Sequence, residues 1–266
     1  MAACVGDGAC RQRLMAILSC MGGARNQTTD PLFPDDCMVP DNKKVDAFLY
    51  CSMQEHRCAP AFINAPVYPA CQDATLVGAN GTVGLGDATF TGLPQLAGPH
   101  PWYKIHGWTL GEPIECQPCQ SVQFDLQGGG GGGGGGAGNS NSSAAFLSNW
   151  TMPNTKGQIF NMTAAATIAP RGGGLPHSKL VNEGRMFGLD FHEPYTVLDH
   201  EPEGDDAFVF FYVCGQTLQG NYTTALVLGR RPEGVGAATR ARLATVAARN
   251  GLAWPDFCDV DNTCFF

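Results

Sequence analysis

The segment Trp102–Gln120 (WYKIHGWTLGEPIECQPCQ) separates two parts of this 266-residue chain that have different sequence patterns. Seven cysteines at close spacing precede it, and apolar segments of strand length, one short helix and a cysteine pair follow it. We interpret the segment as the first strand of a β-barrel and the loop that enters the barrel mouth. Trp102 and Tyr103 are expected to plug one end of the barrel, and Cys116 and Cys119 to tie the mouth to a distant part of the chain.

Length and charge narrow the class of protein. The chain is long enough for about one or two domains with a real core. Its 24 acidic and 16 basic residues give a net charge of −8, which argues against nucleic acid as a partner. No apolar run reaches membrane-spanning length, so we expect a soluble protein that can still dock on a membrane surface. The N-terminus shows neither a signal peptide nor a transit sequence, which predicts either a cytosolic chain or a targeting segment absent from this sequence.

The twelve cysteines favour disulfides over metal binding or redox catalysis. No Cys-x2-Cys pair faces a His pair at zinc spacing, so no metal is expected. The single C-x-x-C, Cys116 to Cys119, follows a loop, whereas a redox-active one normally opens a helix after a strand. Disulfides imply an oxidising compartment. Six N-x-S/T sequons would also fit a secreted structural protein, but such sequons are frequent by chance in a chain of this composition.

Residues 1–72 are predicted to form a small disulfide-rich helical domain. Apolar side chains at helical spacing indicate short helices at 11–21 and 45–57, which are marginal alone. Cross-links among six cysteines would stabilise them: Cys4, Cys10, Cys20, Cys37, Cys51 and Cys58. Residues 73–100, rich in Gly and Pro, are expected to be a linker.

Residues 101–266 are predicted to form the barrel domain. A glycine run at 128–136 lies within an insertion at about 127–145 that we expect to be disordered. A helix is predicted at 237–249, ended by Asn250-Gly251. Successive strands followed by one helix favour a closed antiparallel barrel, and a barrel of about eight strands holds one small apolar ligand. The clearest strand patterns lie at 158–168, 185–198, 207–213 and 222–229.

Four segments, in the same order, give the chain a family resemblance. They are VDAFLYCSMQEHRCAP at 45–60, WYKIHG at 102–107 with PCQSVQF at 118–124, PYTVLDHEPEGDDAFVFFYVCG at 194–215, and DVDNTC at 259–264. With these motifs and its cysteine framework, the chain resembles violaxanthin de-epoxidases and their related proteins over nearly its whole length.

The resemblance implies a fold and a function. The fold is a mainly β, lipocalin-like antiparallel eight-stranded barrel with one C-terminal helix, preceded by a small disulfide-rich domain. The activity is removal of the epoxide oxygen from a xanthophyll in thylakoid lipid, with ascorbate as co-substrate and no metal. The place is the acidic thylakoid lumen of a chloroplast, with association at the membrane surface. The resemblance also implies a disulfide from Cys119 to Cys264, which leaves Cys116, Cys214 and Cys258 as extra or rearranged.

The resemblance places the acid of the reaction at Glu193, where the de-epoxidases carry aspartate. A carboxyl in an apolar barrel stays protonated in mild acid, because desolvation raises its pKa, and it can then protonate an epoxide oxygen. The alternative is that Glu193 points outward beside Pro194 and is solvated. An active-site tyrosine of the family aligns with Leu228, so its hydroxyl is expected to be lost. Val122 and Asp125 stand where the de-epoxidases have mouth-loop histidines.

Further residues are candidates for binding and for sensing pH. Glu115 matches an acidic residue of the family in the mouth loop. His192 and His106 have the residue type whose pKa would let them sense lumenal acid, whereas His200 is expected to be a loop residue. His106 has similar chances of facing the cavity or the solvent. The alternative to an enzyme is a carotenoid- or lipid-binding lipocalin without turnover, and an inward Glu193 would favour the enzyme. The predicted substrate-binding residues are Gln120, Glu115, Phe191, Tyr195 and Tyr222.

Overall fold

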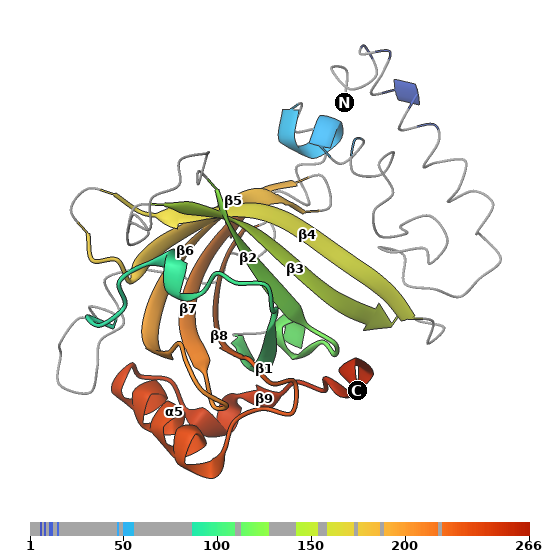
Figure 1. Cartoon of the computed structure of the whole chain (residues 1–266). Helices are drawn as coiled ribbons and strands as arrows, with labels where there is room; N and C mark the ends of the chain where they lie inside the picture. Colours follow the sequence, from blue (N-terminus) through green and yellow to red (C-terminus); the bar gives the residue numbers. More distant parts are fainter. Residues whose placement is uncertain are drawn as a thin grey trace.

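The structure is a computed structural model of the chain, and its C-terminal two thirds contain a β-barrel (Figure 1). The structure describes residues 87–109, 113–127, 142–153, 159–172, 175–186, 189–217 and 220–266, together with a few residues before 56, among them a helical turn at Tyr50–Glu55. The glycine run, residues 73–86 of the expected linker and most of the two predicted N-terminal helices lie outside these ranges.

Eight antiparallel strands close into a barrel, because β1 pairs with β8 on one side and with β2 on the other. A two-residue strand, β9 (Cys258–Asp259), adds to β1 where β2 has left it. This confirms the predicted eight-stranded antiparallel barrel with one C-terminal helix. The strands are β1 (Trp102–Thr109), β2 (Ser121–Gln127), β3 (Ser143–Pro153), β4 (Ile159–Pro170), β5 (Lys179–Met186), β6 (Leu189–Glu201), β7 (Phe208–Thr217) and β8 (Gly220–Gly229).

Three of the four expected strands agree with β4, β7 and β8, but the strand predicted over 185–198 is wrong at its start. Residues 185 and 186 end β5, and β6 begins at Leu189. The sequence of β5, KLVNEGRM, is mostly polar and lacks a long apolar alternation. For that reason the hairpin between β5 and β6 was not predicted.

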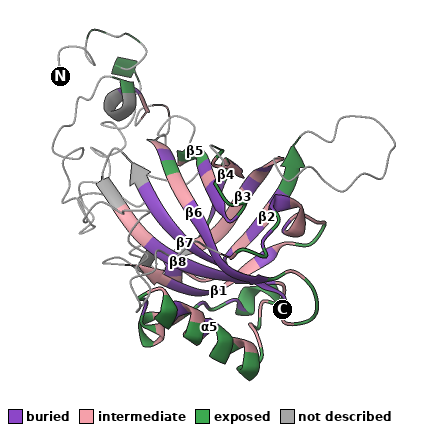
Figure 2. Ribbon diagram, turned by 90° about the vertical axis from the view of Figure 1, so that its left-hand side faces the viewer, coloured by how far each residue is buried: buried purple, intermediate pink, exposed green. Residues whose placement is uncertain are grey.

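The two faces of β7 pack against different parts of the protein. Val209, Phe211 and Val213 belong to the interior core, whereas Phe208 and Phe210 belong to a second core under α5 (Ala237–Arg249). Strands of an antiparallel sheet are usually apolar on one face only. Because α5 and the C-terminal segment cover the outside of the barrel here, both faces of β7 are buried (Figure 2).

One end of the barrel is closed around Trp102. Its side chain is fully buried, and its Nε1 donates a hydrogen bond of 2.7 Å to the carbonyl oxygen of Leu96. The Arg230 guanidinium stacks 3.8 Å from the centre of the Trp102 ring, a cation–π contact that also covers the indole from solvent. Trp102 therefore plugs this end as predicted. Tyr103 does not, because successive residues of a strand point to opposite faces and its ring lies outside against Phe265.

The segment before β1 completes this closed end. Phe90, Leu93 and Leu96 come from the stretch expected to be a linker, yet all three are buried in the interior core. His200 was expected to be a loop residue, which is wrong: it lies buried on β6, with its Nδ1 2.5 Å from Oδ2 of Asp87. Burial raises the pKa of Asp87, but hydrogen bonds from Thr89 and His200 outweigh it and lower the pKa overall. The contact fastens the closing segment to the barrel wall.

The C-terminal helix α5 agrees with its predicted bounds. It buries Leu243 and Ala247 against the barrel, and Arg242 makes two hydrogen bonds to the carboxylate of Asp199 on β6. Gly251 has φ 73°, a left-handed conformation that favours glycine and ends the helix as expected. Among the described residues, no helix is both long and apolar enough to span a membrane.

Candidate functional site

Glu193 of β6 points into the barrel. It shares a strand face with Tyr195 and Val197, both of which belong to the interior core. The Tyr222 hydroxyl of β8 donates a hydrogen bond to Oε1 of Glu193, and the Asn182 side-chain amide of β5 donates one of 2.7 Å to Oε2. The half-buried carboxyl is thus held by side chains from two other strands, and the alternative of an outward, solvated Glu193 is wrong for this structure.

The environment of Glu193 raises its pKa. Burial is the largest cause, because removing a carboxyl from water disfavours its charged form. The hydrogen bonds from Tyr222 and Asn182 act in the opposite direction, since they stabilise the carboxylate. Among nearby charges, the Glu115 carboxylate raises the pKa and the Lys104 ammonium lowers it. The site therefore offers a carboxyl that keeps its proton at a higher pH than a solvated glutamate does.

Tyr222 supplies the hydroxyl that alignment with Leu228 had suggested was lost. Leu228 is fully buried in the interior core and has no contact with the carboxyl of Glu193 that the structure records. Tyr222 lies opposite Gly215 of β7, and its ring occupies the space in which any side chain at Gly215 would lie. Burial, followed by the charge of Glu193, raises the pKa of Tyr222, so the hydroxyl remains a hydrogen-bond donor.

Tyr195 and Phe191, both predicted to bind substrate, also face the interior. Tyr195 makes edge-to-face contacts with Phe146 and Phe211 at centroid distances of 6.1 and 5.2 Å. Burial and the neighbouring Glu193 raise the pKa of Tyr195 well above its ordinary value, so it stays neutral. Phe191 is buried with its ring close to Gly184 of β5, which has no side chain in its way. These two rings form the apolar surroundings of Glu193 along β6.

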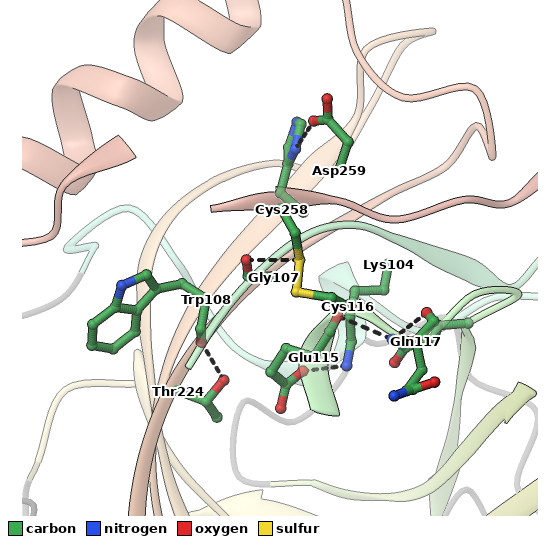
Figure 3. Close-up of a disulfide and its surroundings, with 11 residues drawn as sticks. Lys104, Gly107, Trp108, Glu115, Cys116, Gln117, Thr224, Cys258 and Asp259 are labelled. Atoms are coloured by element: carbon green, nitrogen blue, oxygen red, sulfur yellow. Dashed lines mark hydrogen bonds and ion pairs between the residues drawn. A yellow bond between two sulfur atoms is a disulfide. The ribbon is translucent and has the colours of Figure 1, made fainter. Parts of the chain in front are cut away.

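The mouth loop brings a second carboxyl into the same interior. Glu115 lies on the short helix η3 (Pro113–Cys116) and forms an ion pair with Lys104 of β1 (Figure 3). Each of the two side chains is only 12 % exposed. Gly107 permits this approach, because a Cβ there would lie 2.5 Å from the carbonyl oxygen of Glu115. The loop therefore lies directly on β1.

Gln120 holds this loop in place. Its side-chain amide donates hydrogen bonds to the carbonyl oxygens of Glu115 (3.0 Å) and Gln117 (2.7 Å), and its backbone N–H donates to Oδ1 of Asn262. Gln120 is buried and acts on the backbone of the chain. A direct contact between Gln120 and a ligand stays a prediction.

Two disulfides join the mouth loop to the C-terminal segment. Cys119 pairs with Cys264, as the family resemblance implied, and Cys116 pairs with Cys258 (Figure 3). Their Cα–Cα distances are 6.0 and 5.9 Å, and each closes a loop of more than a hundred residues. Cys116 and Cys258, which were expected to be extra or rearranged, thus form a second cross-link. Cys51 and Cys214 are also disulfide-bonded, whereas the other predicted N-terminal cysteines (Cys4, Cys10, Cys20, Cys37 and Cys58) lie outside the described ranges.

Neither pH-sensing candidate reaches Glu193. His192 lies on the outer face of β6, about half exposed, with its Nδ1 2.7 Å from Oε1 of Glu183. His106 also faces outward, although counting by twos from Trp102 would place it inside, because a β-bulge between Lys104 and His106 shifts the alternation. Its ring is buried under Trp254, and its Nδ1 lies 2.8 Å from Oδ1 of Asp259.

The burial of His106 predicts that the folded protein loses stability in acid. Burial lowers its pKa from 6.5 despite the opposing charge of Asp259, so the folded protein binds the proton less readily than the unfolded chain does. Its contribution to stability should therefore be complete above about pH 6.5 and should fall as the pH is lowered towards its folded pKa. We expect His106→Gln to weaken the acid dependence of the urea midpoint between about pH 7 and pH 5, with the exposed His192→Gln as control. An unchanged dependence in His106→Gln would contradict this role.

Two polar residues of the site were not predicted from the sequence. Asn182 comes from β5, the strand that was missed. Lys104 could have been found, since it lies two residues after Trp102, which was expected inside the barrel. Within the described part of the chain, no group of three or more His, Cys, Asp or Glu side chains is arranged to hold a metal ion.

The chain is similar to one protein family and to several solved structures. A family model described as the VDE lipocalin domain matches residues 1–262. No curated protein matches the chain. Similar solved structures include H1 crustacyanin from the lobster Homarus americanus (12 % identity, TM-score 0.41, 61 % of this chain and 76 % of that one). A second is the tryptamine complex of the amine-binding protein of Rhodnius prolixus (12 % identity, TM-score 0.45, 60 % of this chain and 76 % of that one). A third is the siderocalin Ex-FABP (10 % identity, TM-score 0.42, 64 % of this chain and 95 % of that one).

Proposed function

From the premise that this chain belongs to the VDE lipocalin domain family, we propose that it is an oxidoreductase that removes the epoxide oxygen of a xanthophyll, with ascorbate as the reductant. The observation that carries the proposal is the inward carboxyl of Glu193, held by Tyr222 and Asn182 on a barrel wall that is otherwise largely apolar. The family suggests the reaction class, and the inward carboxyl of Glu193 supports the proposal that it is the proton donor of this reaction.

Glu193 would act as the general acid. The proton of its carboxyl passes to the epoxide oxygen as one C–O bond breaks, so the oxygen leaves its first carbon as a hydroxyl group and not as an alkoxide. Overall, epoxide plus ascorbic acid gives alkene, water and dehydroascorbate, with ascorbate supplying the two electrons and the two protons. Reprotonation of Glu193 returns the site to its starting state.

The inner surface near Glu193 suits a long apolar molecule. The rings of Phe124, Phe146, Tyr195 and Phe211 follow one another in edge-to-face contacts, from β2 and β3 across the interior to β6 and β7. Such rings bury apolar surface without offering charge, and they leave the few polar groups of the wall to orient the reacting end. Substrate held in lipid would have to be taken up at a membrane surface, which is the partner that we propose.

The proposed place of action is the acidic lumen of the thylakoid. The disulfides of the mouth loop fit an oxidising compartment, and the raised pKa of Glu193 fits a mildly acidic one. Both observations agree with the plastid location that is typical of the family.

A pigment assay tests the function. Oxidised protein is incubated with violaxanthin in thylakoid lipid plus ascorbate at about pH 5 and about pH 7, and the pigments are separated by chromatography. We expect conversion at the acid pH and little at the neutral one, because the reaction needs a protonated Glu193. Absence of conversion at both pH values would contradict the proposal.

A carotenoid-binding lipocalin without turnover is the second candidate. It is favoured by the fact that both carboxyl oxygens of Glu193 already accept hydrogen bonds from the protein, so that the site is satisfied without a substrate. In the same assay this function would appear as unchanged violaxanthin that co-elutes with the protein on gel filtration.

Replacing Tyr222 should move the pH profile of turnover. The hydrogen bond from its hydroxyl lowers the pKa of Glu193, so Tyr222→Phe should raise that pKa and keep the carboxyl protonated to a higher pH. We expect the alkaline limb of the profile to move up by about one pH unit, with a lower maximum rate. Tyr212→Phe, on the outer face of β7, is the control and should leave the limb in place. A downward shift in Tyr222→Phe would contradict the assigned hydrogen bond.

A further inference from the structure

Lys104 is a charged side chain inside the barrel that the proposed reaction does not use. It follows Trp102 by two residues on β1, so both side chains point inward, and its own is 12 % exposed. A buried ammonium group is costly unless a counter-charge compensates it. Glu115 is that partner, and it is equally buried. The pair is therefore an internal ion pair and not one of the exposed surface pairs, which contribute little.

Glu115 is not able to leave Lys104 easily, because its loop is fixed on several sides. Gln120 binds the carbonyl oxygen of Glu115, and the neighbouring Cys116 is cross-linked to Cys258. Asn262 of the C-terminal segment binds the Lys104 carbonyl oxygen at 2.8 Å. Loss of one partner of the ion pair would thus leave the other charge buried in the barrel.

The ion pair acts on Glu193 as two opposite charges. Lys104 lowers the pKa of Glu193 and Glu115 raises it, so that the two effects partly cancel while the pair is intact. The other groups that face Glu193 are Tyr222 from β8, Tyr195 from its own strand and the neutral amide of Asn182 from β5. Both tyrosines remain neutral, because burial raises the pKa of each. Within the described part of the chain, Lys104 is therefore the cation recorded as acting on this carboxyl.

We propose that Lys104 is a positioning residue for the acid at Glu193: with Glu115 it forms an internal ion pair that holds the mouth loop on β1 and balances the charge of the barrel interior around Glu193. The inference rests on the proposed function for its catalytic meaning. With the ion pair intact, its two opposite charges partly cancel at Glu193. Removal of either side chain would leave the remaining charge to act on Glu193 without its opposite.

The test compares variants that remove each charge. Lys104→Met removes the cation, so the midpoint of the Glu193 titration should rise by about one pH unit. Glu115→Gln leaves the cation unopposed, so the titration should move down by a similar amount. The double variant Lys104→Met/Glu115→Gln removes both charges and should titrate near the wild type. Arg185→Gln, which breaks the exposed outer pair with Asp190, is the matched control and should change nothing.

The readout does not depend on turnover. The side-chain carboxyl carbons of glutamate are labelled with ¹³C, their shifts are followed against pH, and the Glu193 signal is assigned by its loss in Glu193→Gln. Shifts in opposite directions for the two single variants support the proposal, whereas shifts in one direction, or none, overturn it. If Lys104→Met fails to fold, Glu115→Gln and the double variant decide, since neither leaves an unpaired carboxylate. A wild-type protein that converts no violaxanthin would contradict the proposed function and would leave this result standing.

Discussion

Glu193→Gln is expected to abolish the proposed turnover, with a loss of about 10²- to 10⁴-fold in rate, the usual contribution of a general acid. The amide has nearly the same size and accepts the Tyr222 hydrogen bond, but it has no proton to give at the pH of the reaction. The barrel should tolerate it, because Asn182 Oδ1 is buried without a hydrogen-bond partner in the structure. If the side-chain amide of Asn182 flips, its Oδ1 can accept a hydrogen bond from the side-chain amide introduced at position 193. Violaxanthin that still co-elutes with the variant on gel filtration would show that ligand binding is kept.

Glu183→Gln is the matched control for this substitution. Glu183 lies on β5 opposite His192, on the outer face of the same sheet, and its carboxyl is well exposed. It carries the same change of charge without contact with the interior, so its turnover should equal that of the wild type. Equal rates in Glu193→Gln and the wild type would remove Glu193 from the role of acid.

Gly215→Ala should have the second large effect, because Gly215 has no room for a side chain. A Cβ there would lie 1.8 Å from Cζ of Tyr222 and within 2.3 Å of both neighbouring ring carbons, so the ring must move. We expect a loss of about 1–3 kcal/mol in the free energy of unfolding, as for other overpacked sites, and a fall in turnover as the hydroxyl leaves Glu193. Urea unfolding and the pigment assay measure the two effects.

A double-mutant cycle separates this clash from other causes. In the background Tyr222→Ala the obstructing ring is gone, so adding Gly215→Ala should cost little stability. Gly98→Ala is the control, since its Cβ would meet only Arg230 Nη2 at 3.8 Å, an ordinary contact. If Gly215→Ala costs as much without the tyrosine as with it, the ring contact is not the cause.

Several elements could be predicted from local patterns alone. The helix α5 follows from an Ala-rich run free of Gly and Pro that is ended by Asn250-Gly251, and β7 and β8 follow from their apolar residues. Strand β5 was missed, because its inner face is partly polar: Asn182 sits there to bind Glu193. Strands are predicted from the apolar residues that they pack on the core. The prediction fails for a strand whose inward residues are polar because they belong to the site.

The sequence by itself determined the family, the closed antiparallel barrel and, through the family resemblance, the candidate Glu193 and the Cys119–Cys264 disulfide. The tertiary structure decided which groups meet at Glu193. Glu193, Tyr222 and Asn182 come from three strands, and barrel closure and strand register bring them together, which no local periodicity encodes. A single bulge on β1 leaves Lys104 inside and turns His106 out. Side-chain direction in a strand changes with each inserted residue, so the charge of the interior depended on a feature visible only after folding.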